Sequence, residues 1–127
     1  MKNIFDYKHV KGTTAIALLR DGEFVGKIVC NWSDNPAGSV CTAQVILWDK
    51  EYCPKIKQRH IKTEFLDCYL PAIMIGKAGG YGYDKRSAAI SAALSKGGLH
   101  ELLPVEGGAG NERAIFEDAG FTWCEVC

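Results

Sequence analysis

GKAGGYGYDKRS, at residues 76–87, is the stretch that decides how this chain is organised, and an alanine-rich run follows it. Its first seven residues contain four glycines. Because glycine serves where the backbone needs a positive φ or a close approach, we interpret these residues as a loop rather than a strand or helix. Asp84 predicts an N-cap, residues 85–96 predict a helix, and the glycines at 97–98 predict its end.

A glycine loop at the start of a helix has two interpretations. Its unpaired N–H groups and the positive end of the helix dipole would form an anion site, with Lys77, Lys85 and Arg86 close by in sequence. Alternatively, the loop only allows the helix to lie close to a sheet. A glycine motif without its full context favours this second, purely structural interpretation.

The helix itself carries small residues at a spacing of four, among them Ala89 and Ala93. Residues four apart share one face of a helix, so this face can approach its support closely. Ile90 and Leu94 are the larger apolar anchors of the predicted helix.

Length and composition predict one domain over residues 1–127, of a soluble globular class. Fifteen basic residues balance fifteen acidic ones. This balance argues against a general nucleic-acid coat and against an acidic DNA mimic. The sequence has no run of 18 apolar residues and no apolar signal-peptide core at its start, so we expect a cytoplasmic protein without membrane contact.

The chain has six cysteines, which we expect to be reduced in the cytoplasm and used as small buried apolar groups. Cys124 and Cys127 have the CxxC spacing of zinc and redox sites. Zinc needs two more ligands, and no second such pair is present. The motif also ends a predicted strand, where residues three apart face opposite sides. We therefore predict no metal and no cofactor.

The N-terminal half predicts an antiparallel sheet. Asp21-Gly22 separates the strands 14–20 and 23–32 and is a strong two-residue hairpin signal. Residues 31–39 are rich in turn formers, and residues 40–48 resume as a third strand. Pro71 limits residues 65–75 to an edge strand or a bend.

A second glycine-to-helix junction follows near the C-terminus, with GGAGNER at residues 107–113. Asn111 or its neighbour caps a helix over residues 112–119, which Gly120 ends, and residues 121–127 form a last strand. The whole chain therefore predicts an α+β domain, with an antiparallel sheet of four to five strands and two helices packed on one face.

The motifs KAGGYGYDK at residues 77–85 and GGAG at residues 107–110 resemble small uncharacterised proteins encoded by bacteriophages and prophages. The likeness covers about residues 72–127, and the N-terminal half carries no matching motif. Small phage accessory proteins of this type are often host-takeover or anti-defence factors, including anti-CRISPR proteins. The resemblance thus implies a protein that acts in the cytoplasm of a bacterial host cell, and it carries over no catalytic role.

The sequence shows no catalytic constellation, so we predict that the protein is not an enzyme. The glycine stretch lacks the Gly-Lys-[Ser/Thr] of a phosphate-binding loop, and Lys85 stands where the dinucleotide fingerprint has its third glycine. There is no HExxH pair and no Gly-x-Ser-x-Gly elbow. Tyr81 and Tyr83 could stack on a base, anchor a protein interface, or simply pack across the helix start.

Three hypotheses follow. The first is a phage or mobile-element protein that binds and inhibits a host protein assembly, such as a CRISPR-type defence complex. The second is a module that binds or sequesters a nucleotide or phosphate ligand at the two glycine junctions. The third is local nucleic-acid binding through the basic cluster of Lys55, Lys57, Arg59 and Lys62, whose alternation would suit a strand. A homodimer is compatible with all three.

The candidate binding residues lie at the two junctions. At the first they are Lys77, Gly79, Gly80, Tyr81, Gly82, Tyr83, Asp84, Lys85 and Arg86. At the second they are Gly107, Gly108, Gly110, Asn111 and Arg113.

Overall fold

The computed structural model describes residues 13–35, 38–56, 72–80, 85–106 and 110–126. The strands are β1 (Thr13–Arg20), β2 (Glu23–Asn35), β3 (Gly38–Leu47), β4 (Ala72–Gly80) and β5 (Thr122–Val126). The helices are the 3₁₀ turn η1 (Cys53–Lys55), α1 (Lys85–Gly97) and α2 (Glu112–Asp118).

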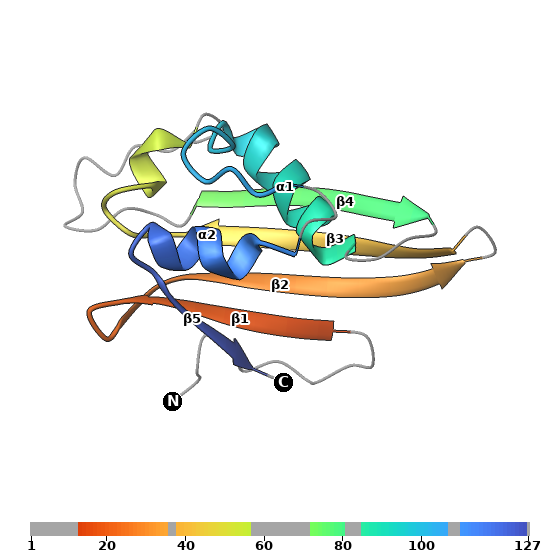
Figure 1. Cartoon of the computed structure of the whole chain (residues 1–127), viewed down its shortest axis with the longest axis horizontal. Coiled ribbons are helices and arrows are strands. Elements are labelled where there is room, and N and C mark those ends of the chain that lie inside the picture. The colour runs from red at the N-terminus through yellow and green to blue at the C-terminus, as the bar shows by residue number, and fades with distance from the viewer. Residues whose placement is uncertain (1–12, 36–37, 57–71, 81–84, 107–109, 127) are drawn as a thin grey trace.

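The five strands form one antiparallel sheet in the order β4-β3-β2-β1-β5, and α1 and α2 lie over the same face of it (Figure 1). This arrangement is a single small α+β domain and confirms the predicted fold class. The first hairpin is also confirmed. Asp21 and Gly22 have φ values of 53° and 81°, as a two-residue turn that matches the strand twist requires.

The predicted turn over residues 31–39 is wrong at both ends. β2 continues to Asn35 and β3 begins at Gly38, with pairs that run from Asn31↔Thr42 to Asn35↔Gly38. The polar residues of this segment have low strand propensity. Pairing with a neighbouring strand outweighs that propensity, because strand preference depends on context more than on the residue itself.

The predicted loop at the start of the glycine stretch is also wrong. Residues 76–80 belong to β4, where Gly76 pairs with Ala43 and Gly80 pairs with Ser39. β4 is an edge strand, which agrees with the edge position expected near Pro71. The strand expected for the basic cluster is wrong at Lys55, which is the last residue of the 3₁₀ turn η1. The other three members of that cluster, Lys57, Arg59 and Lys62, lie outside the described residues.

The sequence also predicted that a glycine would let the helix lie close to the sheet, and Gly76 does so. A Cβ atom at this position would clash with the backbone O of Ala89 and the backbone N of Ala93, and would lie 2.9 Å from the carbonyl carbon of Ala92. The backbone of α1 therefore rests directly on the backbone of β4. Ile90 and Leu94 flank this contact as fully buried anchors, as predicted.

Both main helices end as their glycines predict. Gly98 has a φ of 77°, and the N–H of Leu99 donates to the O of Leu94. Gly120 has a φ of 97°, and the N–H of Phe121 donates to the O of Phe116. These six-to-one hydrogen bonds across a left-handed glycine satisfy carbonyls at the helix ends.

The core lies between the sheet and the helices. Alternate residues of each strand point to the helices, and the buried face of β3 consists of Cys41, Ala43, Val45 and Leu47. At the other side an aromatic group joins α2 to β5, with ring centroids 5.6 Å apart in both Phe116–Phe121 and Phe116–Trp123. The remaining large side chains with no exposed surface are Ile16, Leu18, Ile28, Met74, Leu99, Leu103 and Val105.

The cysteines of the described residues fall into two groups. Cys30, Cys41 and Cys53 have no exposed surface and serve as small apolar groups of the core, as predicted. Cys124 is exposed on β5, which departs from that prediction.

Replacing Gly76 tests the contact between helix and sheet. We expect Gly76→Ala to lower the free energy of unfolding by at least about 2 kcal/mol, because the added methyl group meets rigid backbone rather than a movable side chain. Gly79→Ala is the matched control, since Gly79 lies in the same strand on the uncovered face and is exposed. It should change stability by less than about 0.5 kcal/mol. Urea unfolding of both variants measures the difference, and equal effects would contradict the close approach.

Thiol labelling tests the burial of the cysteines. We expect a maleimide to modify Cys124 in the native protein while Cys30, Cys41 and Cys53 react only after unfolding, because reagents need access to the thiolate. Peptide mapping by mass spectrometry at successive times assigns each site. Labelling of Cys30 at the rate of Cys124 would show that the core is open.

Candidate functional site

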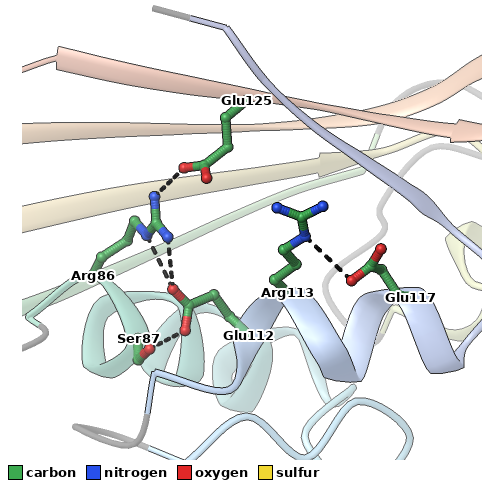
Figure 2. Close-up of polar contacts among 6 residues, drawn as sticks. All are labelled: Arg86, Ser87, Glu112, Arg113, Glu117 and Glu125. Atoms are coloured by element: carbon green, nitrogen blue, oxygen red, sulfur yellow. Dashed lines mark hydrogen bonds and ion pairs between the residues drawn. The ribbon is translucent and has the colours of Figure 1, made fainter.

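The two glycine-to-helix junctions of the sequence meet in space. The first turn of α1 carries Arg86 and Ser87, and the first residue of α2 is Glu112. Figure 2 shows these three side chains pointing toward one another, with Glu125 of β5 on the far side of Arg86. We call these four residues the junction network.

Glu112 is the centre of the junction network. Its Oε1 accepts a hydrogen bond from Arg86 Nε at 3.0 Å and forms an ion pair with Arg86 Nη2 at 2.9 Å. Its Oε2 accepts a hydrogen bond from the hydroxyl of Ser87. Arg86 Nη1 also donates to Oε1 of Glu125. One carboxylate thus joins α1 to α2, and a second joins α1 to β5.

The network is largely removed from solvent. Glu112 is 2% exposed and Ser87 has no exposed surface, whereas Arg86 keeps about a quarter of its side chain in solvent. Burial disfavours the charged guanidinium, but the hydrogen bonds to Glu125 and Glu112 outweigh burial and raise the pKa of Arg86. Arg86 therefore stays charged wherever the protein is folded, and it compensates the buried charge of Glu112.

Arg86 also influences groups beside the network. Its Cζ lies 5.9 Å from the centroid of the Trp123 ring, which is within the range of a cation–π contact. A hydrogen bond from the Cys30 thiol to the sulfur of Cys41 lowers the pKa of Cys41. Burial opposes this shift, and Arg86 adds to it. The same hydrogen bond, together with burial, raises the pKa of Cys30. Cys41 is therefore the more acidic thiol of this buried pair.

Other predicted site residues lie apart from the network. Lys77 lies on the face of the sheet that the helices leave uncovered, because Gly76 and Ala78 on either side of it face α1. Lys85 is half-buried at the start of α1. Arg113 points to solvent and pairs with Glu117 at 3.2 Å, one turn further along α2.

At the second junction, Asn111 occupies the N-cap position of α2 without a side-chain capping bond. Its Oδ1 instead accepts a hydrogen bond from the backbone N–H of Glu106 at 3.3 Å. Gly110 next to it has a φ of 67°, a conformation that favours glycine. The remaining predicted site residues, Tyr81, Gly82, Tyr83, Asp84, Gly107 and Gly108, lie outside the described residues.

The charges of the network bear on the anion-site interpretation. A phosphate at Arg86 would have to displace Glu125 or approach the buried carboxylate of Glu112. The carboxylates of Glu112 and Glu125 already balance the charge of Arg86. The geometry therefore supports a structural link between the helices and the sheet rather than a phosphate-binding site. Within the described residues, no group of three His, Cys, Asp or Glu side chains could hold a metal ion.

The sequence analysis did not identify Glu112 and Glu125 as site residues. They stand 26 and 39 positions after Arg86, and no spacing rule connects them to it. The only local signal is the shared order of an acidic and then a basic residue after each glycine run. That order predicts where the two junctions lie in the sequence, but it does not predict that Glu112 contacts Arg86 and Ser87.

A second surface feature lies on β4. Ile73 is 50% exposed and Ile75 is 46% exposed, and both share the uncovered face of the sheet with Lys77. We call these three residues the β4 stripe. Among the described strands only β3 pairs with β4, so the other side of β4 presents backbone N–H and C=O groups to its surroundings.

Comparison of the chain with protein-family models, curated proteins and solved structures finds no match. In the described part of the chain, no helix has the length and apolar character needed to cross a membrane.

Replacing Glu112 tests the structural link between the helices and the sheet. We expect Glu112→Gln to cost about 3 kcal/mol of unfolding free energy, because it leaves Arg86 without its buried partner. Arg113→Ala removes the exposed Arg113–Glu117 pair on the same helix and should cost at most about 0.5 kcal/mol. Chemical denaturation of both variants gives the two values. If they are equal, the network does not hold the helices together.

Proposed function

We propose that this protein binds another protein through the edge strand β4 and that it works by binding rather than by catalysis. The observation that carries the proposal is the β4 stripe. Ile73 and Ile75 are two of four large apolar residues that stand exposed among the described residues, and they are neighbours on one face of one edge strand. Exposed apolar side chains gathered in this way mark interaction surfaces.

The recognition mode follows from the strand. An extended segment of a partner can add to an unpaired sheet edge, where backbone hydrogen bonds give affinity and alternate side chains give specificity. β4 offers nine residues for such pairing, with Lys77 the single charged side chain among them. The partner segment should therefore carry aliphatic residues opposite Ile73 and Ile75 and a carboxylate opposite Lys77.

The class of partner rests on the resemblance to phage-encoded and prophage-encoded proteins. That resemblance supports a host protein assembly as the partner, a CRISPR-type defence complex as the first case to examine, and the bacterial cytoplasm as the location. The stripe also leads along the chain toward Tyr81 and Lys85, which the same hypothesis assigns to binding.

Affinity capture from a bacterial lysate, with matched variants, tests the proposal. The double change Ile73→Ser with Ile75→Thr and the charge reversal Lys77→Glu should each reduce recovery of one stoichiometric host protein. Leu102→Ser is the matched control, because Leu102 is 48% exposed and lies away from β4. Exposed positions tolerate such changes, so melting temperatures should stay close to that of the parent.

The outcome depends on the pattern across the variants rather than on capture alone. A partner that both β4 variants lose and the Leu102 variant retains supports the proposal. A partner that all variants retain equally excludes the β4 stripe as its binding surface. Recovery of nucleic acid or of a small phosphorylated molecule in place of a protein would support one of the other two hypotheses.

A further inference from the structure

A cleft of about 650 Å³ lies beside the β1–β2 turn. Figure 1 shows this turn at the left end of the sheet. Residues 20, 21 and 23–25 of the first hairpin form one side, and residues 48–51, just after β3, form the other. Its volume falls within the range of small-molecule sites, roughly 300–1,000 Å³. The cleft shares no residue with the junction network or the β4 stripe.

Carboxylates outnumber basic groups in the lining. Four acidic side chains line the cleft against two basic ones, which leaves a formal excess of two negative charges. The acidic residues are Asp21, Glu23, Asp49 and Glu51, and the basic ones are Arg20 and Lys50. The residues that the structure describes provide no ion-pair partner for Asp21 or Glu23.

Arg20 is already held by other groups. Its Nη2 lies 3.4 Å from Oδ2 of Asp49 and 3.6 Å from Oε2 of Glu51. Its Cζ lies 4.5 Å from the centroid of the Phe121 ring. Because these contacts satisfy its charge, Arg20 is not a receptor for an anion, and the negative excess of the lining determines which charge the cleft attracts.

Asp49 supplies an independent sign of a ligand. It is 4% exposed, and its Oδ2 accepts hydrogen bonds from Arg20 and from the backbone N–H of Tyr52. Its Oδ1 is buried and has no hydrogen-bond partner among the residues that the structure describes. A buried carboxylate oxygen normally finds a donor, so Oδ1 in the lining of this cleft can take a hydrogen bond from a bound molecule or a water.

Two aromatic side chains also line the cleft. Phe24 is 44% exposed, and Trp48 is half-buried with its Nε1 donating to the backbone O of Phe24 at 2.8 Å. Aromatic faces attract ammonium and guanidinium groups, and they also pack on the alkyl chains that carry such groups. Aromatic rings and carboxylates in one cleft therefore favour the same class of ligand.

We propose that this cleft binds an ammonium or guanidinium group carried on an alkyl chain. The cationic end meets the carboxylates of Asp49, Glu23 and Glu51, and the alkyl chain lies along Phe24 and Trp48. Two sources share this chemistry, a free organic amine and a basic side chain in a peptide. Among the described residues Arg20 Nε is a buried donor without a partner, so it would donate to the carbonyl oxygen of a peptide, whereas a free amine offers it no acceptor.

Titration of the full-length protein followed by NMR amide shifts, at low salt and pH 7, tests the proposal. The probes are agmatine as a free amine, N-acetyl-arginine amide as a peptide-like cation, and N-acetyl-citrulline amide as its neutral isostere. We expect the two cations to shift amides of residues 20–25 and 48–51 and to bind at least about fivefold more tightly than citrulline, from roughly 1 kcal/mol of charge interaction. Tighter binding of the arginine amide than of agmatine identifies a peptide source, and the reverse order identifies a free amine.

Variants connect the binding to the cleft. Glu23→Gln and Glu51→Gln should each weaken binding of the cations by about threefold, and Phe24→Ser by a similar factor, since exposed contacts of this kind contribute modestly. Glu101→Gln is the control, because Glu101 is an exposed carboxylate outside the lining. Equal binding of citrulline, shifts at other residues, unchanged binding in the three cleft variants, or no shifts up to about 10 mM would overturn the proposal.

Discussion

The contact of backbone on backbone between α1 and β4 is the constraint on which the rest of this fold depends. Gly76 has no side chain, so the helix carbonyl of Ala89 and the amide of Ala93 can lie where a Cβ atom would otherwise be. Ile90 and Leu94 then enter the core on either side of this contact. A helix that lies this close to a sheet has little freedom to rotate, because packed interiors have few voids.

This constraint places the junction network. Once α1 lies on β4, its first turn holds Arg86 and Ser87 where Glu112 of α2 and Glu125 of β5 contact them. Glu112 then joins the two helices through its bonds to Arg86 and Ser87. A buried carboxylate is costly unless it is paired and hydrogen-bonded, and Arg86 and Ser87 provide both conditions. Removing one partner of the network is therefore costly, although the intact network adds little net stability compared with apolar packing.

The same architecture leaves two surfaces for other molecules. Because both helices cover one face, the opposite face of β4 stays exposed and presents aliphatic groups beside one lysine. Because β1 and β2 are joined by a tight turn, the chain after β3 can fold back against it and form the acidic cleft. The two surfaces differ in chemistry, since the first suits an extended protein segment and the second suits an organic cation.

Features that depend on local chemistry could be predicted from the sequence. Asp21-Gly22 predicts its hairpin because few other residue pairs tolerate two successive positive φ values. Gly98 and Gly120 predict helix ends for the same reason, and Ile90 and Leu94 predict a buried face by their helical spacing. From these elements the α+β class could be predicted without any tertiary information.

Features that depend on a partner far away in the chain became visible only in the folded protein. Gly76 belongs to a strand because it pairs with Ala43 of β3, and it is a glycine because the backbone of α1 leaves no room for a side chain there. Neither contact can be inferred from the glycine-rich segment alone. Residues 31–35 are strand for a similar reason. Glu112 is a buried site residue because folding brings it to Arg86. Hydrogen bonds and close packing act over a few ångströms in space, whatever the distance along the chain, and this is why sequence patterns could predict the elements but not these pairings.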